Sequence, residues 1–180
     1  MRASAPIAAA FAFAAALALT ACDDGGGGDS GTGDRGAGRG GAACRMDGVA
    51  VDAVASPAPA AGDTGTVSFT VTNRGAACTL DGLPAVTLTA GGTPVEVPAD
   101  AAAPRQRLTL AEDTAVSFTV TYVRGEAGGG RGLAVRTARV ALPGAADTRD
   151  FPWTYGDVSL KDGGDGVPDA TVGPFQQAGD

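Results

Sequence analysis

Apolar side chains alternate with threonine and serine in several segments of this 180-residue chain. In residues 66–72 and 116–122, every second side chain is Val, Phe or Tyr, and those between are all Thr or Ser. Successive side chains of a β-strand point to opposite faces, so this pattern predicts strands with one buried and one wet face, typical of antiparallel sheets. Shorter or weaker alternation predicts further strands at residues 49–54, 86–89, 95–97, 108–110, 133–142, 151–155 and 170–172. The sequence therefore predicts an all-β domain, an antiparallel β-sandwich.

Turn residues separate these segments. Gly91-Gly92 fits a two-residue hairpin, and Asn73-Arg74-Gly75 ends the first long strand. The five glycines in residues 125–132 predict a loop between strands. Helix is hardly expected, because the Ala-rich residues 99–103 lie between two prolines and are too few for more than a turn.

The first 22 residues have the pattern of a secretory signal. Arg2 supplies a positive start, residues 3–21 carry no charge, and the apolar stretch of residues 7–19 is about as long as a signal-peptide core. The sequence Leu19-Thr20-Ala21-Cys22 resembles the bacterial lipobox, whose cysteine receives a lipid and becomes the mature N-terminus. We therefore interpret residues 1–21 as a lipoprotein signal peptide and Cys22 as the lipidation site. The alternative is an uncleaved membrane anchor, because this uncharged run could just cross a tilted span.

Composition divides the rest of the chain. Residues 22–43 are rich in Gly and Asp, so they bury too little apolar surface to offset their ordering entropy, and we expect a disordered tether there. We expect the folded β-sandwich at residues 44–175 and a flexible tail at 176–180. The formal net charge of −7 argues against a nucleic-acid partner, because an acidic surface repels phosphates.

The three cysteines have separate expected roles. With Cys22 assigned to lipid, Cys44 and Cys78 remain as an even pair in an oxidising compartment, which favours a disulfide between them. The alternative is a metal site with two thiolates, for which the chain offers no histidine and no further cysteine.

One continuous stretch carries a family resemblance. It reads Asn73-Arg74-Gly75-Ala76-Ala77-Cys78-Thr79-Leu80-Asp81-Gly82-Leu83-Pro84-Ala85-Val86. This resembles the N-x-G-x-x-C-x-L-x-G-x-P-x-V core of domain-of-unknown-function family 4232, which occurs in many actinobacterial secreted lipoproteins. The closing sequence Val172-Gly173-Pro174-Phe175 is also similar to relatives, so the resemblance spans roughly residues 44–175.

The resemblance implies an immunoglobulin-like β domain on a lipid anchor. It implies that a strand ends at Asn73, that Cys78 pairs with the earlier Cys44, and that Gly82 and Pro84 open the next strand. Leu83 departs from the aromatic residue often found at its position. The resemblance implies no catalytic residues. An antibody-type domain is a poor match, because Trp153, the single tryptophan, follows both cysteines instead of lying between them.

Catalytic and metal-binding chemistry finds little support. The chain has no histidine, which removes the commonest general base and the usual catalytic zinc ligands, so we expect no enzyme and no cofactor. A carboxylate-pair hydrolase stays as a remote alternative, although most Asp residues fall in expected turns and in the tether. A weak calcium candidate is the acidic loop with Asp162, Asp165 and Asp169, whose spacing is similar to a degenerate calcium loop. Lys161 and Gly163 stand where two ligands are needed, so a solvated loop is the expected state.

Three aromatic side chains cluster at Phe151, Trp153 and Tyr155. They are either part of a strand that covers one end of the core, or a candidate ligand surface for a glycan or protein. We therefore expect a non-catalytic, lipid-anchored β-sandwich on the outer face of the bacterial cell membrane, interacting with a cell-wall component or a protein. A small-ligand or calcium-binding extracytoplasmic protein is the alternative.

Overall fold

Strands β2 (Thr64–Asn73) and β7 (Ala115–Val123) form the centre of the domain in the computed structural model, which describes residues 41–161 and 166–177. They are the two segments of strongest Thr/Ser alternation, and they pair antiparallel with Phe69 opposite Phe118. Their alternating Val, Phe and Tyr side chains, in residues 67–71 and 116–122, point inward and are buried. Their hydroxyl side chains point outward, where Ser68 Oγ lies 3.1 Å from Thr119 Oγ1. The alternation thus places one face of this sheet in the core and the other in water.

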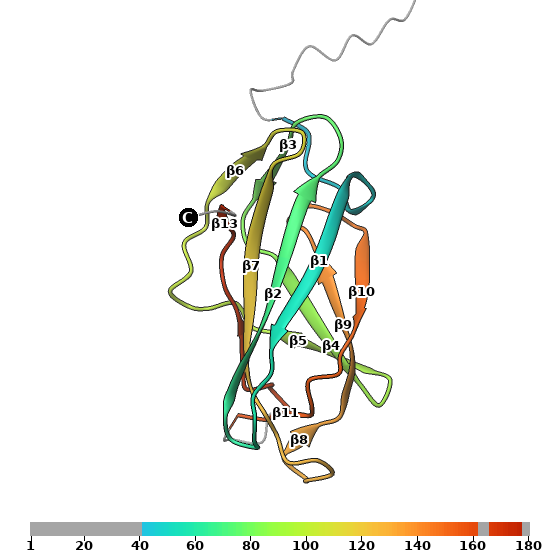
Figure 1. Cartoon of the computed structure of the whole chain (residues 1–180), viewed down its shortest axis with the longest axis vertical. Helices are drawn as coiled ribbons and strands as arrows, with labels where there is room; N and C mark the ends of the chain where they lie inside the picture. Colours follow the sequence, from blue (N-terminus) through green and yellow to red (C-terminus); the bar gives the residue numbers. More distant parts are fainter. Residues whose placement is uncertain (1–40, 162–165, 178–180) are drawn as a thin grey trace, which may run out of the picture. The chain divides into compact units, whose positions relative to one another are not determined.

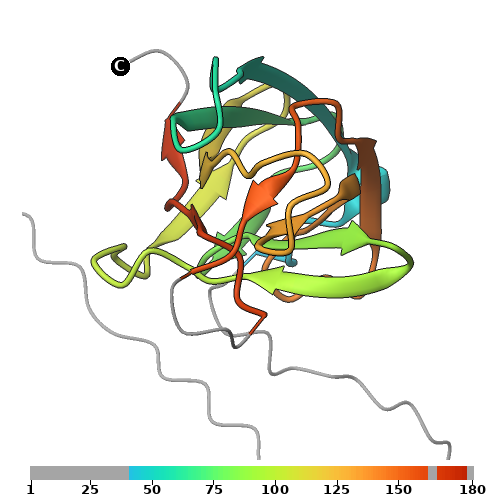
Figure 2. The same ribbon diagram turned by 90° about the horizontal axis from the view of Figure 1, so that it is seen from below.

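The domain has two main layers of strands (Figure 1). One contains the β2–β7 pair and has a short additional strand at its edge, and the other faces it. The first has the order β1 (Val49–Ser56), β2, β7, β12 (Ala170–Val172), and β13 (Gln176–Gln177) also pairs with β7. The second has the order β10 (Thr148–Pro152), β9 (Val135–Ala141), β4 (Ala85–Ala90), β5 (Thr93–Val97). All these strand pairs are antiparallel. Seen from below, β1 and β2 lie in one layer and β4 and β5 in the other (Figure 2).

Two small ladders lie outside these layers. One pairs β3 (Cys78–Asp81) with β6 (Arg107–Leu110), and the other pairs β8 (Gly132–Leu133) with β11 (Val158–Ser159). In the described residues the sole helical element is the single 3-10 turn η1 (Met46–Gly48), and none of them forms a helix able to cross a membrane.

The strand order is that of an immunoglobulin-like sandwich. Strands β1, β2 and β7 stand in the order of strands A, B and E, and strands β10, β9, β4 and β5 in the order of G, F, C and C′. The C-terminal strand β12 occupies the edge beyond β7 where strand D lies in constant-type domains. The predicted all-β, antiparallel sandwich is therefore confirmed.

Aromatic rings connect the layers in the core. Phe69 and Phe118 stack with their ring centres 5.1 Å apart. Phe151, from the β10 strand of the facing layer, meets Phe69 edge-on at 5.2 Å, and Phe175, from the C-terminal segment, meets Phe118 edge-on at 5.5 Å. Offset and edge-to-face geometries are those that aromatic pairs prefer. The Phe69–Phe118 pair thus packs against both the opposite sheet and the C-terminal segment.

A second aromatic contact depends on a glycine in β2. Gly65 is paired with Tyr122, and a Cβ at Gly65 would lie 2.7 Å from the Tyr122 ring and 2.6 Å from the Ala58 nitrogen. The absence of a side chain therefore lets the ring lie against the backbone. The Tyr122 hydroxyl accepts from Ala58 N at 3.4 Å and donates to Tyr155 O at 3.1 Å, which satisfies a buried polar group.

The structure differs from the sequence-based expectation at the C-terminus and around the short β3–β6 ladder. Gln176 and Gln177, which the sequence assigns to a flexible tail, pair with β7 as β13. The expected strand at residues 108–110 is present as β6, but it pairs with β3, which the alternation did not predict. Both segments are too short to display a readable period of two, so tertiary pairing decides their structure.

Phe118→Ala is expected to lower the free energy of unfolding by about 3–5 kcal/mol, because it removes a buried ring that packs against two others. Urea unfolding followed by circular dichroism measures this change. Thr121→Ala, on the wet face of the same strand, is the matched control and should cost less than about 1 kcal/mol. Equal losses for the two variants would contradict this description of the core.

Candidate functional site

The described chain begins by joining β3 through both backbone and disulfide bonds. Thr79 N donates to Ala42 O at 2.9 Å, and Cys44 N donates to Thr79 O at 3.0 Å. Cys44 is joined to Cys78 by a disulfide, which confirms the predicted pairing. Both cysteines are buried. Cys22 lies outside the described residues.

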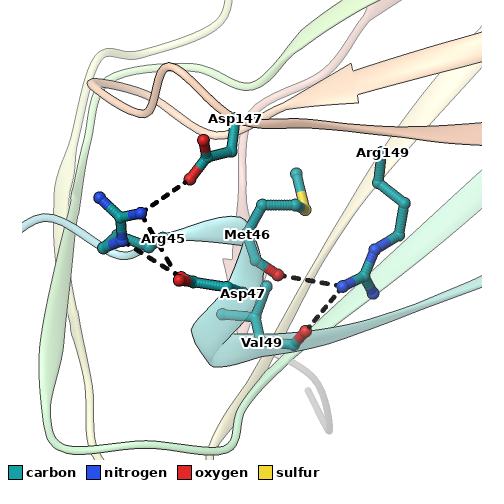
Figure 3. A network of polar contacts seen from close by, with 6 residues as sticks. All are labelled: Arg45, Met46, Asp47, Val49, Asp147 and Arg149. Carbon is teal, nitrogen blue, oxygen red and sulfur yellow. Dashed lines mark hydrogen bonds and ion pairs between the residues drawn. The ribbon is translucent and has the colours of Figure 1, made fainter.

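An ion-pair network holds the next residues to the loop between β9 and β10 (Figure 3). Arg45 Nε donates to Asp47 Oδ1 at 3.2 Å, and Arg45 Nη2 donates to Asp147 Oδ2 at 3.1 Å. The hydrogen bond to Asp47 is the main cause that raises the pKa of Arg45 above its ordinary value. Arg149 Nη2 donates to the carbonyls of Met46 (3.0 Å) and Val49 (3.3 Å). Arg149 of β10 and Asp147 of the preceding loop therefore fix the start of the domain to the second layer.

The contacts of Asn73 explain why the family motif begins with an asparagine. Its side chain is buried, and Nδ2 donates to the carbonyls of Ala76 (3.0 Å), Leu110 (3.1 Å) and Ala111 (3.2 Å). Its Oδ1 accepts from Gly75 N at 3.1 Å. One amide thus closes the turn after β2 and ties it to the end of β6. The sequence indicated a strand end and turn here, but not this link to β6, because the partners are more than thirty residues away.

Trp153 belongs to the core, because its side chain is only 4 % exposed. Its indole Nε1 donates to Gly156 O at 2.8 Å, and its ring meets Tyr122 and Tyr155 edge-on, each with ring centres 5.0 Å apart. Phe151 and Tyr155 are partly buried and pack against the core. Of the two interpretations of this cluster, the arrangement is that of side chains covering one end of the core. An exposed platform at Trp153 is not present.

The acidic loop at residues 162–169 is only partly described. Asp162 and Asp165 lie outside the described residues. Asp169 is half-buried, and its backbone bonds to Ser159 O (2.7 Å) and to Val123 N (2.8 Å). Within residues 41–161 and 166–177, no three Cys, Asp or Glu side chains come close enough to hold a metal ion.

One exposed cross-strand ion pair is well formed. Arg139 Nε and Nη2 donate to the two carboxylate oxygens of Asp150 at 2.7 and 3.0 Å, across β9 and β10. This hydrogen bond is the largest cause that lowers the pKa of Asp150 below its ordinary value. The ion pair lies on the solvent side of an outer strand. It can therefore support the pairing of β9 with β10, but it does not enclose a space in which a reaction could take place.

A groove runs between β6 and the C-terminal segment. It consists of two adjoining hollows of about 510 and 490 Å³ that share Leu108 and Gln177. The first lies between residues 104–108 and 174–177, and the second between residues 108–111 and the start of β7. We call these two hollows the β6–β13 groove. In Figure 1, β6 and β13 lie beside β7 at the end of the domain that carries β3.

β3 determines which backbone groups of β6 face the groove. Thr79 uses both its N–H and its C=O on the segment before η1, on the side of β3 away from β6. These groups alternate in direction along a strand, so the neighbours of Thr79 bond to β6, at Leu108 and Leu110. The backbone groups of Arg107 and Thr109 therefore point away from β3 and toward the groove.

β7 determines the orientation of β13 in the same way. The C=O of Thr119 accepts from Gly173 N at 2.9 Å, so this side of β7 faces the C-terminal segment. Ser117 lies two residues away on the same side, and its partner Gln176 bonds to β7. The residues on either side of Gln176 therefore direct their backbone groups outward.

Gln106 spans one end of the groove. Its Nε2 donates to the carbonyl oxygen of Phe175, which is one of the outward-facing groups of the C-terminal segment. The two open strand edges are therefore about one side chain apart at this point. The groove floor includes the buried side chains of Leu110, Val116 and Phe175 and the half-buried Leu108.

Another hollow lies at the opposite end of the domain, near β8. It has a volume of about 510 Å³ and is formed by residues 61–62 and the glycine-rich loop of residues 124–132. Its wall includes Arg124, whose guanidinium already donates to the carbonyls of Ala58 (2.8 Å) and Pro59 (3.0 Å). The described residues that line this hollow are Gly, Ala, Ser, Arg and Glu, without a large apolar side chain, whereas Leu108, Leu110, Val116 and Phe175 line the β6–β13 groove, which is therefore the stronger candidate site.

Comparison with known proteins identifies the family. A family model described as "Domain of unknown function (DUF4232)" matches residues 40–176, which is well over half of the chain. The chain belongs to this family. No curated protein and no solved structure matches it.

Replacing both Cys44 and Cys78 by Ala is expected to lower the free energy of unfolding by about 4 kcal/mol, because the disulfide closes a loop of 34 residues in the unfolded chain. Urea unfolding of the variant and of the dithiothreitol-reduced native chain should give coincident curves. A loss below about 1 kcal/mol would contradict a stabilising role for this bond.

Arg139→Gln is expected to raise the pKa of Asp150 toward its ordinary value, because the variant removes the charged hydrogen-bond donor. A lowered carboxyl pKa contributes stability that is present above the ordinary pKa and is lost as the pH falls through the lowered one. The variant should therefore show less acid-range loss of stability. Carboxyl-carbon NMR titration measures the pKa, and Arg136→Gln, an exposed arginine on the same strand, should leave it unchanged.

Proposed function

We propose that this member of the DUF4232 family is a lipid-anchored extracytoplasmic protein whose β-sandwich is a non-catalytic binding module. Its place is the outer face of the bacterial cell membrane, and its partner is a cell-wall component or another protein. The observation that carries the proposal is Cys22, which follows Leu19-Thr20-Ala21 at the end of an uncharged apolar segment.

The disulfide supports the extracytoplasmic part of this proposal. Bonds of this kind form and persist in oxidising compartments and are rare where thiols are kept reduced. Cys44 and Cys78 are bonded within the core, so the fold uses an oxidised pair as a structural element. A chain that folds around such a bond suits export before folding.

The start of the domain suits attachment through its N-terminal side. The 19 residues between Cys22 and Ala42, if unstructured, span roughly 25 Å on average, enough to separate a domain from a membrane surface. Beyond them the chain is fastened within a few residues by backbone pairing with β3, by the disulfide and by Arg45. A force applied to the tether would therefore act directly on the disulfide and on the hydrogen bonds that hold the start of the domain.

The non-catalytic part of the proposal is supported by residue chemistry. The chain contains no histidine, and its single lysine, Lys161, is exposed. The ion pairs measured in the described domain, such as Arg74–Asp113 and Arg139–Asp150, are between exposed side chains and leave solvent free to compete. An open groove with strand edges and apolar floor, in contrast, has the chemistry of recognition.

Cys22→Ser is expected to abolish lipid attachment, because serine lacks the thiol that carries the first acyl chain. In a bacterial host that processes lipoproteins, the native chain should incorporate labelled palmitate and partition into the detergent phase of Triton X-114. The variant should incorporate no palmitate. Ser30→Ala, a change in the tether, is the matched control and should behave as the native chain does.

Two outcomes would contradict the anchor. One is palmitate label that persists in Cys22→Ser. The other is a native chain that partitions into detergent with residues 1–21 still attached, as shown by mass spectrometry of its N-terminal peptide. The second outcome would identify the apolar segment itself as the anchor.

A further inference from the structure

We propose that the β6–β13 groove binds an extended segment of a partner protein as an added β-strand, with a carboxylate on the C-terminal side of that segment set against Arg105. This inference rests on the proposed function only in taking the domain to be a binding module. It does not depend on the lipid anchor. It names the surface and the chemistry of the partner.

The first argument is the presence of two open strand edges that face one space. β6 pairs with β3 on one side, and β13 pairs with β7 on one side. The backbone groups of Arg107 and Thr109 point into the groove from one wall, and those of Phe175 and Gln177 from the other. Of these, Phe175 is already met by Gln106. Such rows of N–H and C=O groups are the template on which strand addition takes place.

The second argument is direction. The chain through β6 runs from Gln106 in the first hollow to Leu110 in the second. The C-terminal segment runs the same way, from Pro174 in the first hollow to Gln177 at the second. The two walls are therefore parallel to each other. A strand between them can be antiparallel to both, which is the orientation of the ladders between named strands in the described residues and the stronger one per residue.

The third argument is the floor of the groove. Leu108 is half-buried and is shared by both hollows, and buried Leu110, Val116 and Phe175 lie below it. Alternate side chains of an inserted strand would point toward this apolar floor and toward solvent in turn. Such a strand would also connect the β3–β6 ladder to the sheet of β7, so a ladder now separate would become continuous.

The fourth argument is charge. An antiparallel segment ends, at its C-terminal side, beside Pro104 and Gln106, which line the first hollow, and Arg105 is the residue between them in the chain, with its exposed side chain outside the lining. Arg105 is exposed and has no hydrogen bond or ion pair in the described part of the chain. Asp113 lies at the other end of the groove and pairs with Arg74 at 2.8 Å. A segment with a carboxylate at its C-terminal side and no acid at its N-terminal side complements this distribution.

The test uses the unlipidated Cys22→Ser chain and a panel of synthetic heptapeptides in which Val and Thr alternate. One half of the panel carries Glu at the C-terminal position, and the other half carries it at the N-terminal position. Amide hydrogen exchange by NMR should show new protection at Arg107 and Thr109, whose N–H groups face the groove. The amides of Leu108 and Leu110 serve as an internal control, because they already bond to β3.

Two variants distinguish the contribution of the β6 edge to binding from the contribution of the charge on Arg105. Thr109→Pro removes one groove-facing N–H but no bond of the β3–β6 ladder, so the fold should persist while peptide affinity falls at least tenfold. Thr109→Val keeps that N–H and should bind as the native chain does. Arg105→Gln should weaken the C-terminal Glu peptides about three- to fivefold at low salt, whereas Arg136→Gln, an exposed arginine elsewhere, should not.

The same measurements name the results that would overturn the proposal. No peptide protecting Arg107 and Thr109 at concentrations of about 1 mM would reject strand addition at this groove, whatever the outcome for Cys22. Protection only after deletion of residues 178–180 would show that the chain's own end occupies the groove. Protection that rises with protein concentration and needs no peptide would show that a second copy occupies it. Either of these results would replace the external partner by a segment of this chain.

Discussion

The pairing of β2 with β7 is the contact on which the rest of the sandwich depends. Its register runs from Thr64 opposite Val123 to Thr72 opposite Ala115, and it sets Phe69 against Phe118. A shift by one residue would turn every buried Val and Phe of one strand into water and every hydroxyl into the core. β2 then receives β1 at its outer edge, while the outer edge of β7 receives β12 and β13. Among the described residues, β13 pairs with Ser117 and Val116 of this edge, and the groove lies beside that pairing.

Long strands could be predicted from the sequence and short ones could not, for a physical reason. Segments 66–72 and 116–122 have enough residues for a period of two to be unmistakable, and both are strands. The Cys44–Cys78 bond could also be predicted, because two cysteines remain once Cys22 is assigned to lipid. β13 has two residues, both glutamines that pattern alone assigns to a tail. Its strand conformation comes from the free edge of β7, which is a property of the assembled sheet.

The position of Trp153 likewise depends on tertiary contacts that a local sequence pattern does not contain. Aromatic residues at 151, 153 and 155 fit a strand with one covered face, but β10 ends at Pro152 and the chain turns there. Trp153 N donates to Arg136 O at 2.9 Å, and its ring is covered by Tyr122. The ring of Tyr122 lies where it does because Gly65 has no side chain. Whether Trp153 lies in the core or on the surface therefore depends on Gly65, 88 residues earlier in the chain and beyond the reach of a local pattern.

The edges of the two sheets explain why the groove differs from the rest of the surface. β5 and β10 are outer strands that contain Pro94 and Pro152, and β1 begins with carbonyls that Arg149 covers. Proline and charge on an outer strand prevent edge-to-edge association with other sheets. β6 and β13 contain no proline, and the one charged residue in them is Arg107, which lies near Asp81 of β3; the two strands face each other across a space that Gln106 can span. An extended sheet is too wide to enter there, whereas a single strand is not. The same geometry thus protects the edges of β6 and β13 from pairing with another sheet and leaves them accessible to one peptide strand.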